Sequence, residues 1–201
     1  MLIALSNADD HDFELIVDQC TGEGASLEWH WNNFQSRDAI RLKSWDFVVL
    51  QDRSGGPLEE QDSFEHHAGL LDAEINKQGA KTVLFMTWAN RQRPDTQVTL
   101  TAAYTNLAKE INAILAPVGV AWEAVHRVAP DIDLHHRDGR HANPVGSYLT
   151  ACVFYAVLFK TSPEGLVGIF SYKGKKRLEL EKDRALLLQK AAWETVCSIG
   201  D

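Results

Sequence analysis

The chain has 201 residues, of which 45% are hydrophobic and 24% are charged, and this composition indicates one domain, residues 1–201, with a sizeable core. Its net charge of −8 argues against nucleic acid or an anionic membrane as the main partner, because both attract clustered Lys and Arg. The one basic cluster, residues 173–177, is followed by acidic residues and therefore indicates a solvated linker.

Cysteine content and apolar runs exclude further classes of protein. Cys20, Cys152 and Cys197 are too few and too scattered for a disulfide framework or a zinc cluster, so we expect buried thiols. Residues 1–10 lack the basic and apolar regions of a signal peptide, and no segment approaches about 18 uncharged apolar residues. The chain as written is therefore expected in the cytoplasm, or in the periplasm or outside the cell if a signal peptide precedes Met1. The sequence predicts no cofactor.

Short apolar strands alternate with helices along the first part of the chain. The hydrophobic pattern predicts, in chain order, the end of a helix at residues 1–10, a strand at 13–18, a strand at 46–51, a helix at 61–78, a strand at 82–88, a helix at 97–115 and a strand at 118–122. Near-continuous apolar strands such as FVVL and TVLFM are typical of a parallel sheet that is covered on both faces. Right-handed crossovers then give a three-layer α/β/α sandwich with its functional loops at the carboxyl ends of the strands.

The last third of the chain is predicted to be helical. A strongly apolar helix spans residues 144–159, a short helix starts at Glu164 behind the cap signals Ser162 and Pro163, and a last helix spans residues 183–197. The apolar stripe of the last helix indicates that it covers the sheet.

The turn from Asp138 to Pro144 carries the strongest functional signal in the sequence. Asp138 and His141 are an acid and a base three residues apart, a spacing that suits a carboxylate orienting an imidazole as general base. Asn143 and Pro144 are typical of an N-cap and a first helical residue, so the pair would lie at the rigid start of a helix. The alternative is a turn carboxylate beside a surface histidine.

Three segments resemble one enzyme superfamily. WDFVVLQDRS at residues 45–54, TVLFMTWA at 82–89 and DGRHANPVGSYLTACVFYAVLF at 138–159 occur in the order found in SGNH hydrolases. The similarity is greatest to bacterial SGNH-type proteins with a late Asp-Gly-x-His-Pro-Asn turn, and it covers about residues 22–166. This chain has Ala142 where that turn has proline, which leaves the acid and the base in place. The resemblance implies a flavodoxin-like α/β fold and the hydrolysis of esters.

The resemblance also implies roles for residues outside the turn. Gly24, in a glycine-rich turn, and Gln51, at the end of a strand, would donate hydrogen bonds to the oxyanion. Trp88 and Arg91, at the end of the next strand, are candidates for substrate binding. The substrate would be a small-molecule or carbohydrate ester, with acetyl esters of sugars as one class. The alternatives are a glycine turn, a polar strand end, a core tryptophan and a surface arginine.

The nucleophilic serine of the superfamily is not found in its usual place. It lies in a Gly-Asp-Ser or Gly-Asn-Ser turn after the first strand, and this sequence contains neither turn. We therefore expect the first strand and its serine to lie upstream of Met1. Ser26 is a candidate substitute nucleophile, but its position ahead of Glu28 favours helix capping.

Two other functions compete with an ester hydrolase. A catalytically inactive remnant or a carbohydrate-binding protein would keep the cleft without the nucleophile. A metal-dependent phosphoesterase would need a metal at His135, Asp138 and His141, where Arg137 and Arg140 would lie beside the cation. The sequence does not predict the oligomeric state.

Overall fold

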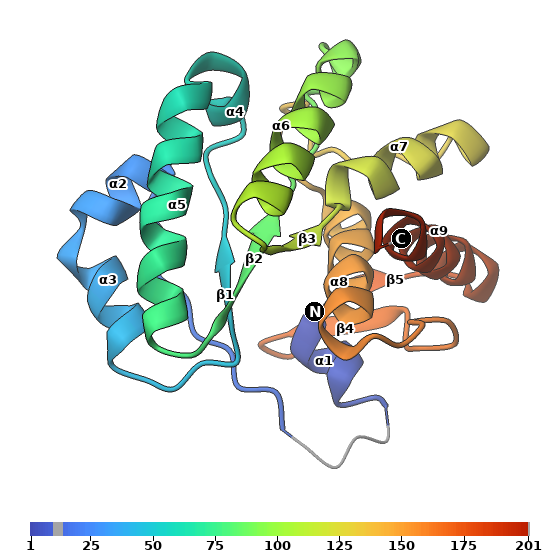
Figure 1. The fold of residues 1–201 in the computed structure, drawn as a ribbon. Helices are drawn as coiled ribbons and strands as arrows, with labels where there is room; N and C mark the ends of the chain where they lie inside the picture. Colours follow the sequence, from blue (N-terminus) through green and yellow to red (C-terminus); the bar gives the residue numbers. More distant parts are fainter. Residues whose placement is uncertain (10–13, 201) are drawn as a thin grey trace. The chain divides into compact units, whose positions relative to one another are not determined.

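The computed structural model describes residues 1–9 and 14–200, which divide into two compact units. The first unit comprises Met1–Val17, Asn90–Pro94 and Pro117–Asp201, and the second comprises Asp18–Ala89 and Asp95–Ala116. Figure 1 shows the ribbon, coloured along the sequence. That the chain is a single domain stays a prediction.

The second unit holds a parallel three-stranded sheet. Its strands are β1 (Phe47–Leu50), β2 (Lys81–Phe85) and β3 (Ile114–Ala116), in the order β1-β2-β3. Phe47 pairs with Lys81 at the start of the β1 and β2 ladder, and Val83 in the central strand is fully buried. The sheet confirms the predicted α/β class and the strands predicted at 46–51 and 82–88.

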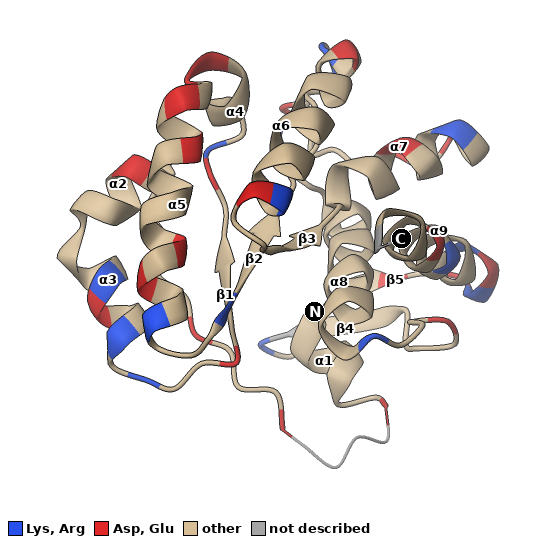
Figure 2. Cartoon of the chain, viewed as in Figure 1, with Lys and Arg blue, Asp and Glu red and all other residues tan. Residues whose placement is uncertain are grey.

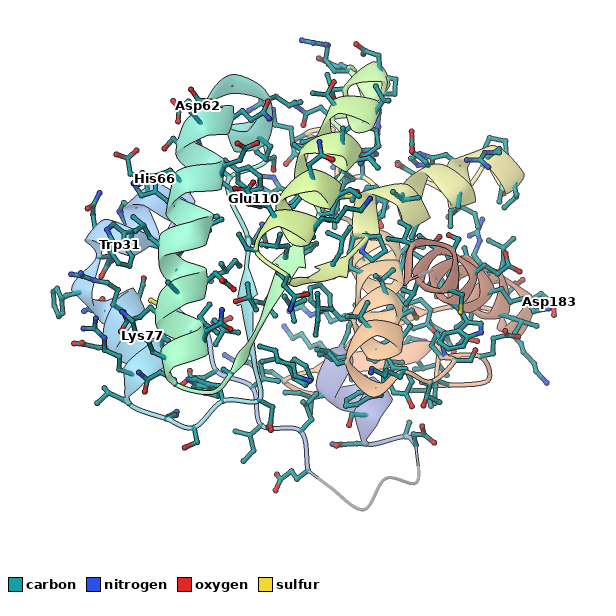
Figure 3. All side chains as sticks on the ribbon, in the orientation of Figure 1. Trp31, Asp62, His66, Lys77, Glu110 and Asp183 are labelled. Atoms are coloured by element: carbon teal, nitrogen blue, oxygen red, sulfur yellow. The ribbon has the colours of Figure 1, made fainter. Side chains whose placement is uncertain are left out.

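Five α-helices accompany the sheet among the described residues of the second unit. They are α2 (Leu27–Asn32), α3 (Phe34–Arg41), α4 (Gly56–Glu59), α5 (Gln61–Lys77) and α6 (Gln97–Glu110). The short 3-10 helix η1 (Pro94–Thr96), whose first residue belongs to the first unit, precedes α6 in the sequence. α5 packs against β2, and α6 packs against β3. Figure 3 shows Asp62 near the beginning of α5 and Lys77 at its end, a charge order that complements the helix dipole. α5 confirms the helix predicted at residues 61–78.

The first unit is built around helix α8. Its elements are α1 (Leu2–Ser6), α7 (Val118–Val128), α8 (Pro144–Phe159), the hairpin strands β4 (Ile169–Tyr172) and β5 (Lys175–Glu179), and α9 (Lys182–Gly200). α8 contacts α1, α7 and α9, and it carries no charged residue, as Figure 2 shows. Leu149 and Val153 of this helix are fully buried, so its apolar surface forms the core of the unit. No helix in the described part of the chain is long and apolar enough to span a bilayer.

The start of α8 is fixed by neighbouring residues. Asn143 is its N-cap, and Asn143 Oδ1 accepts hydrogen bonds from the amides of Val145 (2.8 Å) and Gly146 (3.0 Å). Pro144 follows at the first helical position, where a missing N–H leaves no helical hydrogen bond unmade. Gly146 lies so close to Leu134 that a Cβ at this position would clash with the Leu134 carbonyl oxygen. The helix therefore begins directly against the segment that leads into the predicted acid–base turn.

The strand predicted at residues 13–18 is wrong. Phe13 lies outside the described residues, and residues 14–18 form no strand. Ile16 and Val17 are 73% and 53% exposed, so this short apolar run fills no buried position of a sheet.

Residues 118–122 open helix α7 instead of forming a strand. The buried residues of α7 have helical spacing and include Val118, Ala121, Trp122 and Val125. The strand lies earlier, at β3, which overlaps the end of the helix that the sequence predicted at 97–115. That helix ends as α6 at Glu110, and Asn112 follows with a φ of 54°, a left-handed conformation that an α-helix does not contain.

The basic segment 173–177 belongs to a β-hairpin and is not a linker. Lys173 and Gly174 form the turn between β4 and β5, with the positive φ values of 50° and 70° that a type I′ turn requires. The segment is exposed, as predicted. The helix predicted from Glu164 is also wrong, because the chain turns there, with the Leu166 amide donating to the Pro163 carbonyl.

The three thiols are free but differ in burial. Cys152 is fully buried on α8, as predicted, whereas Cys20 is partly buried and Cys197 is exposed. Cys197 follows the exposed Glu194 by one helical turn and so lies on the polar face of α9. Cys20 Sγ lies 3.3 Å from the hydroxyl of the buried Ser36. The prediction of buried thiols therefore holds for Cys152 alone.

Candidate acid–base site

Backbone hydrogen bonds close the turn that carries the predicted acid and base. His135 and Ala142 form an antiparallel bridge, and the His136 amide donates to the carbonyl of His141 at 2.6 Å. The Gly139 amide donates to the His136 carbonyl at 3.0 Å, and Gly139 has a φ of 72°, which glycine adopts without strain. The turn is therefore a tight loop of defined shape.

Asn143 ties this turn to α8. Besides capping the helix, its side-chain Nδ2 donates to the carbonyl oxygen of Asp133 at 2.7 Å. Its backbone amide donates to the carbonyl of Leu134 at 2.9 Å. One residue thus holds both the start of the helix and the chain entering the turn, so the turn rests on a packed helix.

Asp138 and His141 lie in hydrogen-bond contact. His141 Nδ1 is 2.8 Å from Asp138 Oδ2. The other carboxylate oxygen, Oδ1, accepts hydrogen bonds from the backbone amides of Arg140 (2.8 Å) and His141 (2.9 Å). The three-residue spacing therefore places one carboxylate oxygen against the ring of His141. The two backbone amides hold the other oxygen and so fix the orientation of the carboxylate.

A second histidine shares the same carboxylate oxygen, with His136 Nδ1 3.1 Å from Asp138 Oδ2. Hydrogen bonds from the His141 ring and from the Arg140 and His141 amides hold the pKa of Asp138 well below its usual range. An ionised carboxylate only accepts, so both rings donate to it from Nδ1. Neutral His141 then presents an unprotonated Nε2, and the side chain is 83% exposed.

Arg91 contacts this turn from the segment that follows β2. Its guanidinium Nη2 lies 2.7 and 2.9 Å from the two carboxylate oxygens of Asp133. Its backbone amide donates to the carbonyl of Gly139 at 2.9 Å. Substrate binding by Arg91 stays a prediction. In the structure, the contacts of Arg91 are with Asp133 and with the acid–base turn.

The ring of His135 is buried beside two other rings. Its centroid lies 4.9 Å from that of Trp122 and 5.9 Å from that of His126, on which it stacks. Burial, and to a smaller extent the neighbouring His135, lowers the pKa of His126. Within residues 1–9 and 14–200, no three side chains of potential ligands gather around a metal position. The proposed metal set of His135, Asp138 and His141 therefore gains no support from their arrangement.

In the second unit, a buried carboxylate joins the segments of the two predicted oxyanion donors. Gln51 follows β1 and is exposed, whereas the next residue, Asp52, is only 3% exposed. Asp52 Oδ2 accepts a hydrogen bond from the amide of Leu27, the first residue of α2, at 3.1 Å. Gly24, with a φ of 64°, lies in the turn just before α2. Asp52 therefore fastens the Gly24 turn to the end of β1.

The surroundings of Asp52 favour its neutral form. Burial is the main cause that raises the pKa of this carboxyl, against the opposing hydrogen bond from the Leu27 amide. Gly56 packs so closely on the carboxyl that a Cβ there would overlap Asp52 Oδ1. The carboxyl is thus held tightly between the backbone of α4 and the start of α2.

Two further candidates lie in the second unit. Ser26 Oγ accepts a hydrogen bond from the Trp29 amide at 3.1 Å and so caps α2, the role that its position favoured. Trp88 is half-buried, with its ring centroid 6.3 Å from that of Phe85. The second unit thus holds Gly24, Ser26, Gln51 and Trp88, while the first holds Arg91, Asp138 and His141. The convergence of the two sets stays a prediction.

Sequence reasoning did not single out three residues that support these groups. His136 meets Asp138 only because the turn folds back on itself. Asp133 meets Arg91 across 42 residues, a separation at which no local pattern is informative. Asp52 had a usable signal, since an acidic residue that closely follows an apolar strand needs a polar partner when it is buried.

Comparisons with known proteins find similarity in structure. No family model matches the sequence, and no curated protein matches it significantly. A DUF4886 family protein from Bacteroides uniformis ATCC 8492 superposes with a TM-score of 0.70 at 18% identity, over 87% of this chain and 80% of that chain. A protein from Slackia heliotrinireducens that has been proposed to be an SGNH hydrolase superposes with a TM-score of 0.59 at 26% identity, over 67% of this chain and 80% of that chain. The fold is SGNH-like, as the sequence predicted.

Proposed function

We propose that this chain acts as an ester hydrolase in which His141 is the general base and Asp138 orients it. The observation that carries the proposal is the 2.8 Å contact between His141 Nδ1 and Asp138 Oδ2 at an accessible ring. The SGNH-like fold adds support, because one protein of similar structure has been proposed to be an SGNH hydrolase.

The proposed chemistry is acyl transfer through a covalent intermediate. His141 Nε2 takes the proton of a hydroxyl while the hydroxyl oxygen bonds to the ester carbonyl carbon, and Asp138 stabilises the imidazolium. The same proton passes to the leaving alcohol as the C–O bond breaks. Water then attacks the acyl-enzyme with the same proton transfers and releases the acid. A general base of this kind contributes about 10² to 10⁴-fold.

The attacking hydroxyl in this proposal belongs to a serine, as in the SGNH hydrolases that the sequence resembles. The sequence contains no Gly-Asp-Ser or Gly-Asn-Ser turn, and Ser26, the substitute candidate, caps α2. A fluorophosphonate probe that labels activated serines, followed by peptide mass spectrometry, would identify the nucleophile in whichever segment of the natural protein it lies.

Gly24 and Gln51 are the proposed oxyanion donors. Their support is the hydrogen bond from the Leu27 amide to Asp52, which fastens the Gly24 turn to the end of β1. A preorganised donor aimed at the developing oxyanion is worth about 3 to 4 kcal/mol. As substrates we propose acetyl esters of carbohydrates, because the half-buried ring of Trp88 offers an aromatic surface for a sugar.

The test compares the purified natural protein, including any residues that precede Met1, with its His141→Ala variant and a His66→Ala control on p-nitrophenyl acetate and on an acetylated xylo-oligosaccharide. His66 is an exposed histidine on α5 in the other unit, labelled in Figure 3. We expect His141→Ala to lower kcat by about 10² to 10⁴-fold, because the base is lost. The control should retain full activity.

Two results would contradict the hydrolase proposal. Turnover that survives His141→Ala would remove the base from the mechanism. Saturable binding of the acetylated oligosaccharide without any turnover would favour the carbohydrate-binding alternative.

A further inference from the structure

We propose that Arg91 is a positioning residue that clamps the acid–base turn, so that Asp138 and His141 keep the geometry needed for proton transfer. This inference rests on the proposed function, since it assigns a role toward the same pair. It also gives Arg91 a different role from the substrate binding that its position at the end of a strand suggested.

The guanidinium of Arg91 holds the chain on the way into the turn. Nη2 donates to both carboxylate oxygens of Asp133, at 2.7 and 2.9 Å. The carbonyl oxygens of His135 and His136 lie 3.3 and 3.4 Å from the same nitrogen. Because Nη2 carries two hydrogens, the carboxylate bonds dominate and the carbonyls share the same donors. One nitrogen therefore contacts a side chain and two backbone carbonyls of the segment that precedes Asp138.

The backbone of Arg91 holds the tip of the turn. Its amide donates to the carbonyl of Gly139 at 2.9 Å, immediately after Asp138. Gly139 is buried, has a φ of 72°, and would place a Cβ 3.4 Å from the Cβ of Arg91. The two backbones therefore approach closely at a position that favours glycine. Asp138 lies between the part of the turn that the guanidinium holds and the part that the amide holds.

The opposite arm of the turn has its own support, so the loss of the guanidinium should leave the fold intact. Asn143, on that arm, caps α8 with its Oδ1 and donates from its amide and Nδ2 to the carbonyls of Leu134 and Asp133 on the entering arm. The side chains of Arg91 and Asp133 are 46% and 60% exposed, and exposed ion pairs contribute little to global stability. Proton transfer is more demanding, because a displacement of about 1 Å can cost roughly 10²-fold in rate.

The experiment compares Arg91→Met and Arg91→Lys with Arg184→Met as a matched control. Arg184 pairs with Asp131 at 3.4 Å in the same unit, with similar exposure. On p-nitrophenyl acetate we expect Arg91→Met to lower kcat about 10 to 100-fold with KM unchanged. Arg91→Lys should recover part of that loss, because an ammonium can still pair with Asp133. The control should match wild type.

A second readout does not depend on activity. The Nδ1 proton of His141, assigned by its loss in His141→Ala, should give a downfield NMR signal while it is held by Asp138. We expect this signal in wild type and in Arg184→Met, and its broadening or loss in Arg91→Met.

The outcomes separate the clamp from the proposed function. A raised KM with unchanged kcat would show substrate binding and overturn the clamp. An unchanged NMR signal in Arg91→Met would also overturn it. If wild type hydrolyses no ester, the proposed function fails, while loss of the signal in Arg91→Met alone still supports the clamp.

Discussion

The two regions that carry the proposed catalytic groups are supported in different ways. In the acid–base turn, the side chains of Asp138 and His141 are 39% and 83% exposed, and they stand on the packed start of α8. The Gly24 turn is fastened by Asp52, which is 3% exposed. Exposed polar contacts add little to stability, whereas a lost partner in the interior is costly. Substitutions of the exposed Asp138 and His141 should therefore separate activity from stability, and substitutions in the second region should change both.

The largest effect that would sharpen this comparison is expected from Asp138→Asn. The Asn Oδ1 would keep the bonds from the Arg140 and His141 amides, which leaves Nδ2 facing the histidine rings. An amide donor there selects the wrong tautomer of His141, and we expect kcat to fall by about 10³ to 10⁴-fold. The thermal midpoint should stay close to that of wild type. Steady-state kinetics and circular dichroism melts measure both, and a large drop in the midpoint would break the comparison.

A substitution at the start of α8, beneath the turn, should lower the free energy of unfolding. In Gly146→Ala the added methyl group would clash with the Leu134 carbonyl oxygen and the Trp122 ring, and overpacking of this kind costs about 1 to 3 kcal/mol. The control is Gly69→Ala on α5, where a Cβ meets no atom within 4 Å and alanine favours the helix. Urea unfolding should show Gly146→Ala destabilised and Gly69→Ala stabilised. Equal stabilities would mean that α8 is not a rigid base.

In the second region, Asp52→Ala should reduce both stability and activity. It removes the acceptor of the Leu27 amide, and an unsatisfied buried donor costs about 1 to 3 kcal/mol. Because the Gly24 turn is then no longer fastened to the end of β1, kcat on p-nitrophenyl acetate should fall. Unchanged kcat in the folded variant would remove Gly24 from the proposed oxyanion site.

The variant Asp52→Asn tests the same carboxyl through pH. Because burial raises its pKa in the folded state, the native protein binds more protons than the unfolded chain between the ordinary and the raised pKa. This group therefore favours folding most at low pH, and its contribution falls as pH rises through that window. Asp52→Asn keeps an acceptor for Leu27 but cannot titrate, so its unfolding free energy should gain on wild type from about pH 4 upward. Parallel pH profiles for the two proteins would contradict the assignment.

The smallest effect is expected outside both regions, at the hairpin turn. Lys173 has a φ of 50°, and Asn adopts such a conformation more readily than Lys. Lys173→Asn should therefore raise the free energy of unfolding by less than about 1 kcal/mol and leave kcat unchanged. A change in activity would show that this hairpin, too, bears on the site.

The parts of the fold that were predictable have local signals. β1, β2 and α8 follow from apolar runs of the right length, and the cap at Asn143 marks where α8 begins. Short runs were ambiguous. Residues 118–122 are apolar enough for a strand, yet they form a helix because their burial continues at helical spacing to Val125.

In the candidate site, too, local contacts were predictable from the sequence and contacts between distant segments were not. Asp138 and His141 were predictable as a pair because a single turn places them together. The contacts of Arg91 with Asp133 and of Asp52 with Leu27 join segments that are far apart in the sequence, so only the folded chain reveals them. The second histidine on Asp138 depends on the shape of the turn, which the spacing of residues does not specify.

Helix α8 has a consequence for how the protein is made. α8 is free of charge, and its partner α9 is synthesised after it. When the growing chain has left the ribosome as far as residue 159, α1 and α7 can pack against α8. The apolar surface of α8 that contacts α9 stays uncovered until α9 has been synthesised. This unfinished intermediate would expose apolar surface and is therefore expected to be prone to aggregation. Slower translation between residues 159 and 182 would prolong its exposure and lower the yield of folded protein.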